Sequence, residues 1–191
     1  MAKFTKQAIM FCLLKLLEEK SIDKITIRDI CETCEINRNT FYYYYSDIYE
    51  VLEELMRYET EESLAEKEGE ESFYEEYLRR YHLVLENKKA VYHVYDSKNR
   101  ALILTYFYTI TEDFVKKHVM RAAEGKNVSE KQLRFVIDFY SNSMIGNVLR
   151  WLKDGMPDKK EDLIWRLSMA YQTTIQTLIE KSDIFETMPR K

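Results

Sequence analysis

Glycine and proline are scarce in this chain, and that scarcity limits the folds it can adopt. Only 4 glycines and 2 prolines occur among its 191 residues. A sheet protein of this length needs many turns, and glycine and proline are residues that turns use heavily. Leucine, glutamate and lysine are plentiful, which favours helices. The composition therefore predicts an all-α fold of long helices with few connections.

Hydropathy sets further bounds on the class of protein. Hydrophobic residues make up 46% of the chain, enough for a packed core. No apolar run reaches the length of about 18 residues that a membrane-spanning helix needs. The N-terminal stretch MAKFTKQAIMFCLLKLLEEK has a helical charge pattern and no small-residue cleavage site. We therefore expect no signal peptide, no membrane partner and a cytoplasmic location.

Charge is distributed unevenly along the chain. The formal net charge is −4, which by itself disfavours nucleic acid as a partner. Residues 47–71, however, hold 11 acidic and 2 basic side chains, a local charge of −9 that leaves the remainder at +5. Because the acid is concentrated in one segment, the rest of the chain remains free to meet an anionic partner.

The first 45 residues predict three helices. The first is strongly apolar and covers residues 6–19. A capping box of Thr26 and Asp29 opens the second helix, and Asn37 caps a third over residues 38–44. A very short connection joins the second helix to the third, which is typical of a helix-turn-helix.

The third predicted helix contains four consecutive tyrosines, Tyr42 to Tyr45. At about 100° per residue they point in different directions. A helix that reads DNA needs this distribution, because one side anchors to its own domain while the other enters the major groove. A helix buried on all sides is the alternative, and it would bury polar side chains at a cost. By position, Phe41 and Tyr45 anchor the helix, Asn39 and Tyr43 lie opposite, Arg38 and Tyr42 share one flank, and Thr40 and Tyr44 share the other.

Residues 6–52 resemble the N-terminal domain of TetR-family transcriptional regulators. The run from Ile36 to Tyr43, INRNTFYY, is similar to the family's V-S-R-G-T-F/L-Y-x motif. Further matching residues are Ile9, Cys12, Leu13 and Leu16 in the first helix and Thr26 to Ile30 in the second. The resemblance implies a helix-turn-helix DNA-binding domain at residues 1–47 and a helical regulatory and dimerisation domain at residues 48–191. From the residues alone, Ser46-Asp47 starts a longer helix through the acidic segment.

The resemblance also implies which residues contact DNA. Asn39 and Tyr43 are placed to read bases, and Tyr42 and Tyr44 to contact phosphates. The predicted DNA-binding residues are Lys6, Thr26, Ile27, Arg28, Asn37, Arg38, Asn39, Thr40, Tyr42, Tyr43 and Tyr44. Two positions depart from the family, which usually has glycine at position 35 and a phosphate-binding lysine at position 48. The chain has Glu35 and Ile48 there, so we expect a weaker salt dependence of DNA binding.

The three cysteines all lie in this N-terminal region. Cys31 and Cys34 form a C-x-x-C pair, a spacing that serves zinc sites and redox chemistry. Zinc needs more ligands, and only Cys12 remains, with no histidine in the domain. The match to the family places all three where it usually has alanine. That implies free cysteines acting as small apolar core residues, with redox sensing as the alternative.

Beyond residue 48 the sequence shows no catalytic pattern. His82, His93 and His118 are scattered, and neither a glycine-rich phosphate loop nor a nucleophile elbow occurs. We therefore expect no enzyme activity, no cofactor and no metal. The region is rich in aromatic residues, and in TetR-family proteins it often encloses a small-molecule effector. The residues predicted to line such a site are Tyr77, Tyr81, Tyr95, Tyr108, Tyr140 and Met144. For any single one of them, an ordinary helical core or an amphipathic surface tyrosine is the better explanation.

Two long helices close the chain. Ser129 caps the first and Asp158 with Glu161 caps the second. Both carry broad apolar faces, which favour burial against another subunit, although a monomeric core is the alternative. The stretch from Gly146 through Trp151 to Gly155 is similar to a G-x-x-x-x-W-x-x-x-G motif on the dimer-forming helix of some TetR-family members. The predicted dimer-interface residues are Leu133, Ile137, Met144, Val148, Trp151, Leu167, Tyr171 and Leu178.

Two hypotheses for function remain from different classes. The first is a homodimeric repressor that binds a palindromic operator in double-stranded DNA and is released by a small-molecule effector. The second is a co-activator or interaction protein that keeps the fold without binding DNA. Steep salt dependence of binding to DNA distinguishes them, since only the first releases counterions from phosphates.

Overall fold

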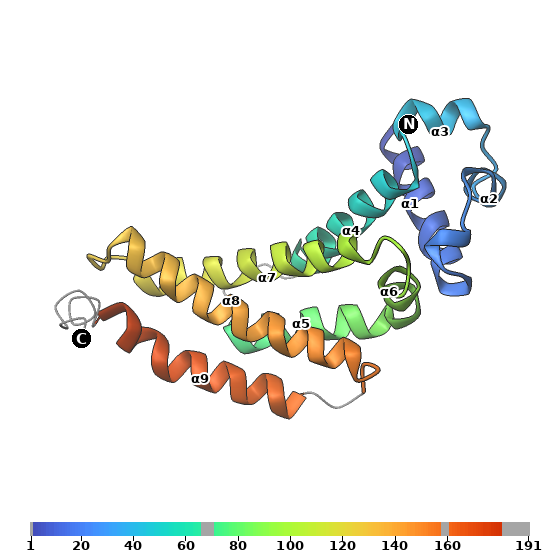
Figure 1. Cartoon of the computed structure of the whole chain (residues 1–191). Coiled ribbons are helices and arrows are strands. Elements are labelled where there is room, and N and C mark those ends of the chain that lie inside the picture. Colours follow the sequence, from blue (N-terminus) through green and yellow to red (C-terminus); the bar gives the residue numbers. More distant parts are fainter. Residues whose placement is uncertain (1, 66–70, 158–160, 181–191) are drawn as a thin grey trace. The chain divides into compact units, whose positions relative to one another are not determined.

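The computed structural model of the chain describes residues 2–65, 71–157 and 161–180, and these ranges contain helices but no strand (Figure 1). This confirms the all-α prediction. In chain order the elements are α1 (Ala2–Glu19), the short 3₁₀ helix η1 (Ile22–Lys24), α2 (Ile27–Thr33), α3 (Arg38–Tyr44), α4 (Ile48–Ala65), α5 (Phe73–Glu86), α6 (Lys88–Tyr95), α7 (Arg100–Ala123), α8 (Glu130–Lys153) and α9 (Glu161–Glu180).

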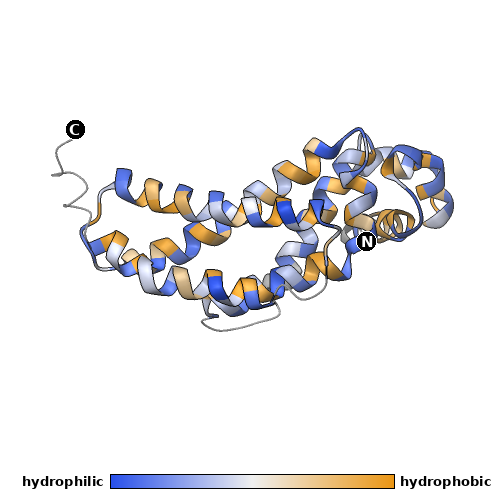
Figure 2. Ribbon diagram, turned by 60° about the horizontal axis from the view of Figure 1, so that its bottom comes forward, coloured by the Kyte–Doolittle hydropathy of each residue, from blue (hydrophilic) through white to orange (hydrophobic). Residues whose placement is uncertain are grey.

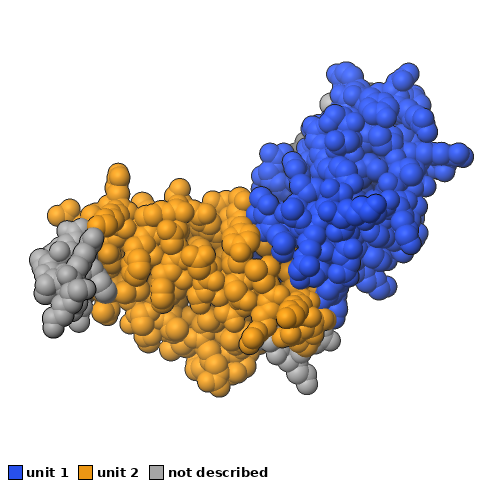
Figure 3. Space-filling view, in the orientation of Figure 1, with its two compact units in different colours: residues 1–70, 79–106 blue, residues 71–78, 107–191 orange. Residues whose placement is uncertain are grey.

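The chain divides into two compact units, coloured separately in Figure 3. The first unit comprises residues 1–70 and 79–106, and the second comprises residues 71–78 and 107–191. All three helices of the predicted DNA-binding domain lie in the first unit. The boundary predicted after residue 47 remains a prediction.

Helices α1 to α4 form what we call the head. Hydrophobic and hydrophilic residues alternate along the helices in Figure 2, and α1 packs against both α2 and α4. The side chains of Ile9, Leu13, Ile30, Phe41 and Val51 are fully buried. The predicted start of the fourth helix is confirmed, because Asp47 Oδ1 accepts hydrogen bonds from the Tyr49 and Glu50 N–H groups at 2.8 and 2.9 Å.

Helix α6 and the segment after it complete the first unit by contacting the head. Helix α6 packs on α1, and Ser21 Oγ donates to the His93 carbonyl at 3.2 Å. The Lys98 N–H donates to Asp23 Oδ2 at 3.0 Å, and Asn99 Nδ2 donates to Tyr49 Oη at 2.7 Å. Two parts of the head, the η1 segment with its cap and α4, are therefore hydrogen-bonded to one segment, residues 93–99.

The second unit is built around the pairing of α8 with α9, which run side by side in Figures 1 and 2. Ser129 caps α8 as predicted, with its Oγ accepting from the Gln132 N–H at 3.2 Å. The Gln132 side chain donates to the Leu178 carbonyl of α9 at 2.8 Å. The predicted cap at Asp158 lies outside the described residues.

Candidate nucleic-acid interface

Helix α2 begins at the predicted capping box. Thr26 lies in an extended conformation, and its Oγ1 accepts a hydrogen bond from the Asp29 N–H at 3.1 Å. In return Asp29 Oδ2 accepts from the Thr26 N–H at 2.8 Å, and the Lys20 ammonium lies 3.1 Å from the same oxygen. These contacts, the backbone bond first, lower the pKa of Asp29. The box fixes where α2 starts, and so where Ile27 and Arg28 stand.

The turn after α2 directs the next helix. The Glu35 N–H donates to the Glu32 carbonyl at 3.4 Å, and the Ile36 N–H donates to the Cys31 carbonyl at 3.0 Å. Together these two bonds form a Schellman motif, in which the residue after the C-cap is left-handed. Glu35 has φ 56°, a conformation that glycine adopts without a Cβ penalty. Glutamate thus takes the turn conformation expected of glycine, at a cost in conformational energy.

Helix α3 is capped by Asn37 and anchored by two aromatic side chains. Asn37 Oδ1 accepts from the Thr40 N–H at 2.8 Å. Phe41 is fully buried and Tyr45 is 2% exposed, and their ring centres lie 6.1 Å apart. Burial raises the pKa of the Tyr45 phenol. The predicted anchoring face of this helix, and its span of residues 38–44, are confirmed.

The remaining faces of α3 carry the side chains predicted to contact DNA. Tyr43 is 80% exposed and Tyr42 is 56% exposed. The Tyr43 and Tyr44 rings meet edge to face at 4.9 Å. The other members of the set lie around them: Arg38 and Asn39 are exposed, and Thr40 and Tyr44 are half-buried. Exposed phenols, an amide and a guanidinium on one short helix provide both donors and acceptors to a partner that lies along it.

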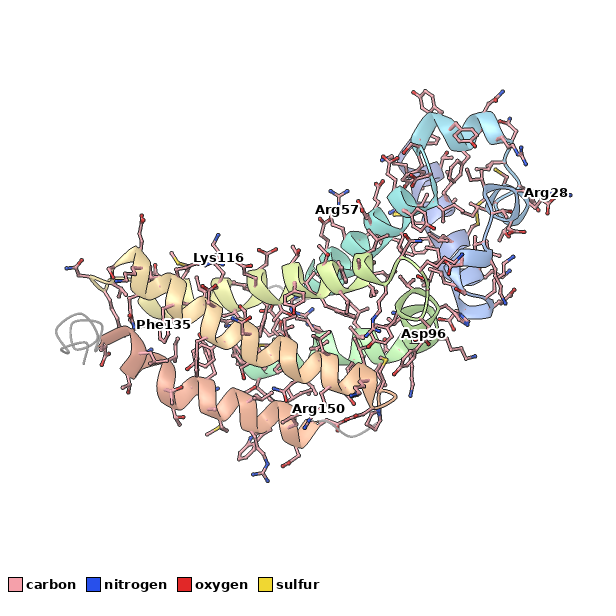
Figure 4. All side chains as sticks on the ribbon, viewed as in Figure 1. Arg28, Arg57, Asp96, Lys116, Phe135 and Arg150 are labelled. Atoms are coloured by element: carbon pink, nitrogen blue, oxygen red, sulfur yellow. A yellow bond between two sulfur atoms is a disulfide. The ribbon has the colours of Figure 1, made fainter. Side chains whose placement is uncertain are left out.

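Two of the predicted cationic contacts already have carboxylate partners. Lys6 Nζ lies 3.0 Å from Glu54 Oε2 and 5.2 Å from the centre of the Tyr45 ring. Arg28 Nε lies 2.7 Å from Glu32 Oε1, and the side chain extends outward from α2 in Figure 4. The Arg28 pair is largely exposed and easily exchanged. Lys6 is held more firmly, because it joins α1 to α4 and also covers an aromatic ring.

The cysteines differ from their predicted state. Cys12 of α1 and Cys34, the C-cap of α2, form a disulfide with their Cα atoms 6.0 Å apart. The expectation of free cysteines is therefore wrong for these two residues. It holds for Cys31, which is free and buried, with its thiol pKa raised chiefly by that burial. The pairing depends on how α1 packs against α2, which the spacing of cysteines along the chain does not reveal.

The residues predicted to line an effector site do not form one group. Tyr81 and Tyr95 belong to the first unit, and Tyr77, Tyr108, Tyr140 and Met144 belong to the second. All are buried except Tyr108, which is 48% exposed. Within the second unit, the Tyr140 ring lies 5.0 Å from that of Tyr171, and the Tyr77 ring lies 6.0 Å from that of Phe114. Burial raises the pKa of Tyr77 to about 12.

A buried polar cluster in the second unit escaped the sequence analysis. Glu76 is fully buried, with its carboxylate 3.0 Å from His118 Nε2 and 2.8 Å from Lys117 Nζ. The His118 ring lies 5.3 Å from Phe73, which stacks on Tyr171 at 4.0 Å. A buried carboxylate needs such partners. The sequence does contain a signal for this cluster. Glu76 lies on the same helical face as Phe73 and Tyr77, and a carboxylate on an apolar face indicates a buried polar partner.

The described residues form a surface depression that does not involve the predicted effector residues, and they form no metal site. A shallow depression of about 710 Å³ in the first unit is lined by Glu18, Glu86, Lys88, Lys89, Tyr92 and His93. None of these residues belongs to the predicted effector set. Among the residues that the structure describes, no group of three or more His, Cys, Asp or Glu side chains has an arrangement suited to a metal ion. No helix in the described part is long and apolar enough to cross a membrane.

The predicted dimer residues fall into two classes by burial. Ile137, Met144, Trp151 and Tyr171 are each at most 6% exposed and belong to the core of their own chain. Leu133, Val148, Leu167 and Leu178 are half-buried. Large apolar side chains exposed on α8 and α9 are instead Phe135, Phe139, Trp165 and Met169, with exposures of 47, 52, 49 and 38%. Phe135 is labelled on α8 in Figure 4.

Phe135 and Phe139 form a continuous patch with open surface beyond it. Their rings stack 6.2 Å apart, and on the same face of α8 a Cβ added to Gly146 would meet no atom within 4 Å. The four side chains buried in the core have little surface left for a second copy. The large apolar surface that these helices leave open to solvent belongs to their exposed neighbours.

Comparisons with known proteins find two family matches along the chain. Residues 13–55 match the family described as bacterial regulatory proteins, tetR family, and residues 71–172 match the family described as transcriptional regulator C-terminal region. A search of curated proteins finds no match. A solved structure named dihydroxyacetone kinase operon activator DhaS is similar with a TM-score of 0.62 and 17% sequence identity, over 94% of this chain and 97% of that one.

The likeness to DhaS at this identity concerns the fold. The family matches go further, because the C-terminal one alone covers more than half of the chain and the N-terminal one contains the whole of α2 and α3. The chain belongs to the TetR family of transcriptional regulators.

Proposed function

We propose that the protein is a cytoplasmic, non-enzymatic repressor that binds a palindromic operator as a homodimer and releases it when a small-molecule effector binds. One observation carries the DNA-binding part of this proposal. Helix α3 buries Phe41 completely while Tyr43 on the other side is 80% exposed. A helix held by one face and displaying polar groups on the other suits the major groove.

The exposed groups of α3 have distinct roles in this proposal. Asn39 and Tyr43 face base edges, where an amide can pair with adenine and a phenol can hydrogen-bond or pack on a thymine methyl. Tyr42 and Tyr44 donate their hydroxyls to phosphates on the groove walls, which fixes the register of the helix on DNA. The Arg28 guanidinium exchanges its exposed pairing with Glu32 for a phosphate.

The exposed apolar surface of α8 and α9 supports dimerisation. Phe135 and Phe139 stack on one another, and about half of each ring surface is exposed. Two large rings that stay exposed on one helix are candidates for burial in an interface. A two-fold dimer places two α3 helices about 34 Å apart on DNA, which explains why the expected operator is a palindrome.

Effector release follows from a population shift. A ligand that prefers a different spacing between the two α3 helices lowers operator affinity by no more than its own differential affinity for the two states. In the second unit, Tyr77 and Tyr140 supply rings and hydroxyls close to the aromatic pair of Phe73 and Tyr171. These side chains are the proposed starting point for mapping the effector.

A second candidate function is co-activation through protein contacts, without DNA binding. One observation favours it. Lys6 is paired with Glu54 and Arg28 with Glu32, which reduces the free positive charge that the head offers to phosphates.

Selection of DNA fragments from the source genome by the purified protein tests the proposal. The wild type is compared in modest salt with Tyr43→Ala and Arg38→Ala. Met120→Ala, at a 48% exposed residue of α7 far along the chain from the head, is the control. We expect one palindromic motif from the wild type and the control, and its loss in both α3 variants.

The outcome separates the two candidates. If the wild type recovers no motif at any salt concentration, the DNA-binding proposal fails and α3 is better explained as a surface for protein contacts. If a motif is recovered, its affinity should fall with added salt, because phosphate contacts release counterions.

A further inference from the structure

The disulfide of the head lies at a sensitive point of the fold. It joins Cys12 of α1 to Cys34, which ends α2 three residues before the N-cap of α3. The Cα separation of 6.0 Å lies within the usual range of about 4.4 to 6.8 Å for disulfides. In the structure the bond therefore joins α1 to the end of α2 across an ordinary backbone separation.

The three cysteines differ in their access to reagents. Cys12 and Cys34 are half-buried, whereas Cys31 is 6% exposed. Burial raises the pKa of the Cys31 thiol, so that little of its reactive thiolate is present. Oxidation is thereby directed to the Cys12–Cys34 pair. Cys31 does not take part, although it lies only three residues before Cys34, the C-cap of the same helix.

The bonded head keeps the surface that the proposed function needs. With the bond in place, Asn37 still caps α3 and Tyr43 is still 80% exposed. The bond also holds the turn that contains the left-handed Glu35, the residue next to Cys34. A cross-link at this position therefore restrains the turn that directs α3 without hiding its exposed face.

We propose that Cys12 and Cys34 form a reversible thiol–disulfide site through which oxidation strengthens DNA binding by the head. The inference rests on the proposed function. A protein that binds DNA works in the cell interior, where thiols are kept reduced and disulfides are usually transient, catalytic or redox-sensing. A disulfide in such a protein is therefore a state that oxidation creates and reduction removes.

The oxidant is a hydroperoxide, and the reaction balances with it alone. One cysteine thiolate attacks the peroxide oxygen, which breaks the O–O bond and leaves a sulfenic acid on that cysteine together with an alcohol or water. The second thiol attacks the sulfenic sulfur, the S–S bond forms, and hydroxide leaves and takes up the proton as water. The two thiols lose two electrons, and the peroxide gains them.

The bond acts mainly by limiting the disordered states of the head. It closes a loop with a sequence separation of 22 residues. A loop of that size is expected to raise the midpoint of thermal unfolding by roughly 5 to 15 °C. Because the turn before α3 is then ordered before DNA arrives, less ordering remains for the binding step. We expect operator affinity to rise about fivefold or more, within the usual range of coupling between sites.

The test uses the full chain as wild type, Cys12→Ser, Cys34→Ser and the matched control Cys31→Ala. Each reduced protein is treated with hydrogen peroxide, mapped by mass spectrometry of non-reduced peptides, and then treated with dithiothreitol. Thermal unfolding is measured in both states, with binding to a duplex recovered from the genome and to a random-sequence duplex in low salt. Comparing the two states of one variant cancels any effect of the substitution on folding.

The wild type and Cys31→Ala should form the Cys12–Cys34 link, gain thermal stability and bind DNA more tightly, with all three changes reversed by dithiothreitol. The two serine variants should show none of them. Absence of the link after peroxide, or a link with unchanged stability and affinity, overturns the inference. If the link stabilises the head but neither state binds any duplex, the DNA-binding function has failed, and with it the regulatory role, while the modification site stands.

Discussion

Helices α3 and α8 both expose aromatic side chains, but of different kinds. On α3 the exposed residues are tyrosines, Tyr42 and Tyr43, at 56 and 80% exposure. On α8 they are phenylalanines, Phe135 and Phe139, at 47 and 52%. A phenol brings a hydrogen-bonding group to its partner, whereas a bare ring brings only apolar area. This difference supports the proposal that α3 meets a polar partner, DNA, and α8 an apolar one, a second copy of the chain.

The turns that end α2 and α8 extend this comparison to the backbone. After α8, the Gly155 N–H donates to the Leu152 carbonyl at 3.1 Å and the Met156 N–H to the Trp151 carbonyl at 2.9 Å. This is the same Schellman motif that follows α2, with Gly155 at φ 86° where the head has Glu35 at φ 56°. In the second unit, glycine occupies the left-handed position directly after the C-cap, although the next residue, Met156, is also left-handed at φ 49°. In the head, glutamate occupies that position, beside the proposed DNA-binding surface.

The largest expected effect comes from placing charge on the apolar face of α8. In the double variant Phe135→Asp, Phe139→Asp, two carboxylates would be buried without partners in the proposed dimer interface. We expect the dimer dissociation constant to rise by about 100-fold or more, since hot-spot residues contribute about 2 kcal/mol or more each. Sedimentation equilibrium measures the change. Met120→Asp, on α7, is the control, and an unchanged dimer in the double variant would place the interface elsewhere.

The second prediction concerns the hydroxyl groups of α3. Tyr43→Ala should weaken operator binding by about 1–3 kcal/mol, the range for a lost base contact. Tyr43→Phe should lose only the share of the binding free energy that the Tyr43 hydroxyl contributes. Tyr42→Phe should instead weaken operator and random DNA alike, because a phosphate contact carries no sequence information. Titrations with both duplexes distinguish these cases, and equal losses on both duplexes for Tyr43→Ala would contradict a base-reading role.

Local sequence rules predicted the head well, because the contacts that define α3 are short-range. The Thr26–Asp29 capping box, the Asn37 cap and the burial of Phe41 and Tyr45 all follow from spacings of three or four residues. On α8 the same periodicity was ambiguous, because both flanks of the helix are apolar. It marked Ile137 and Met144 as interface residues, and only packing against α9 shows that they belong to the core.

Contacts between distant residues were beyond sequence reasoning. Lys6 and Glu54 are 48 residues apart in the chain, and nothing near either residue indicates that they pair. Cys12 and Cys34 are paired by the packing of α1 on α2, while the nearer Cys31 stays free. In each case the tertiary fold selects one partner among several that are chemically equivalent.

The third prediction concerns the left-handed residue of each turn, which is replaced by glycine in the head and by alanine after α8. Glu35→Gly should raise the free energy of unfolding of the head by about 1 kcal/mol, because it relieves a left-handed side chain. Gly155→Ala should lower that of the second unit by about the same amount. No atom lies within 4 Å of the added Cβ at position 155, so the loss is conformational and not steric.

Glu35→Ala is the matched control for the turn of the head. It removes the charge but keeps the Cβ, so urea unfolding should place it close to the wild type. Native-state hydrogen exchange assigns each change to its unit. Equal stabilisation by Glu35→Gly and Glu35→Ala would show that charge, and not backbone strain, sets the cost of this turn.

The smallest expected effect is that of pH on the stability of the two helix starts, and it should differ between α2 and α8. The cap of α2 contains a carboxylate, Asp29, whose pKa is lowered by the Thr26 N–H and the Lys20 ammonium. The side chain that caps α8 is Ser129, which does not titrate. Because the pKa of Asp29 is lower in the folded state, its ionised form stabilises the fold at any pH above the ordinary value of about 3.9. This stabilisation is lost as the pH falls through the lower pKa of the folded state. Between pH 5 and 3, amides in the first turn of α2 should therefore lose more protection from hydrogen exchange than those of α8. Asp29→Asn should remove that difference, and a parallel loss at both helices in the wild type would show that the capping carboxylate is not its source.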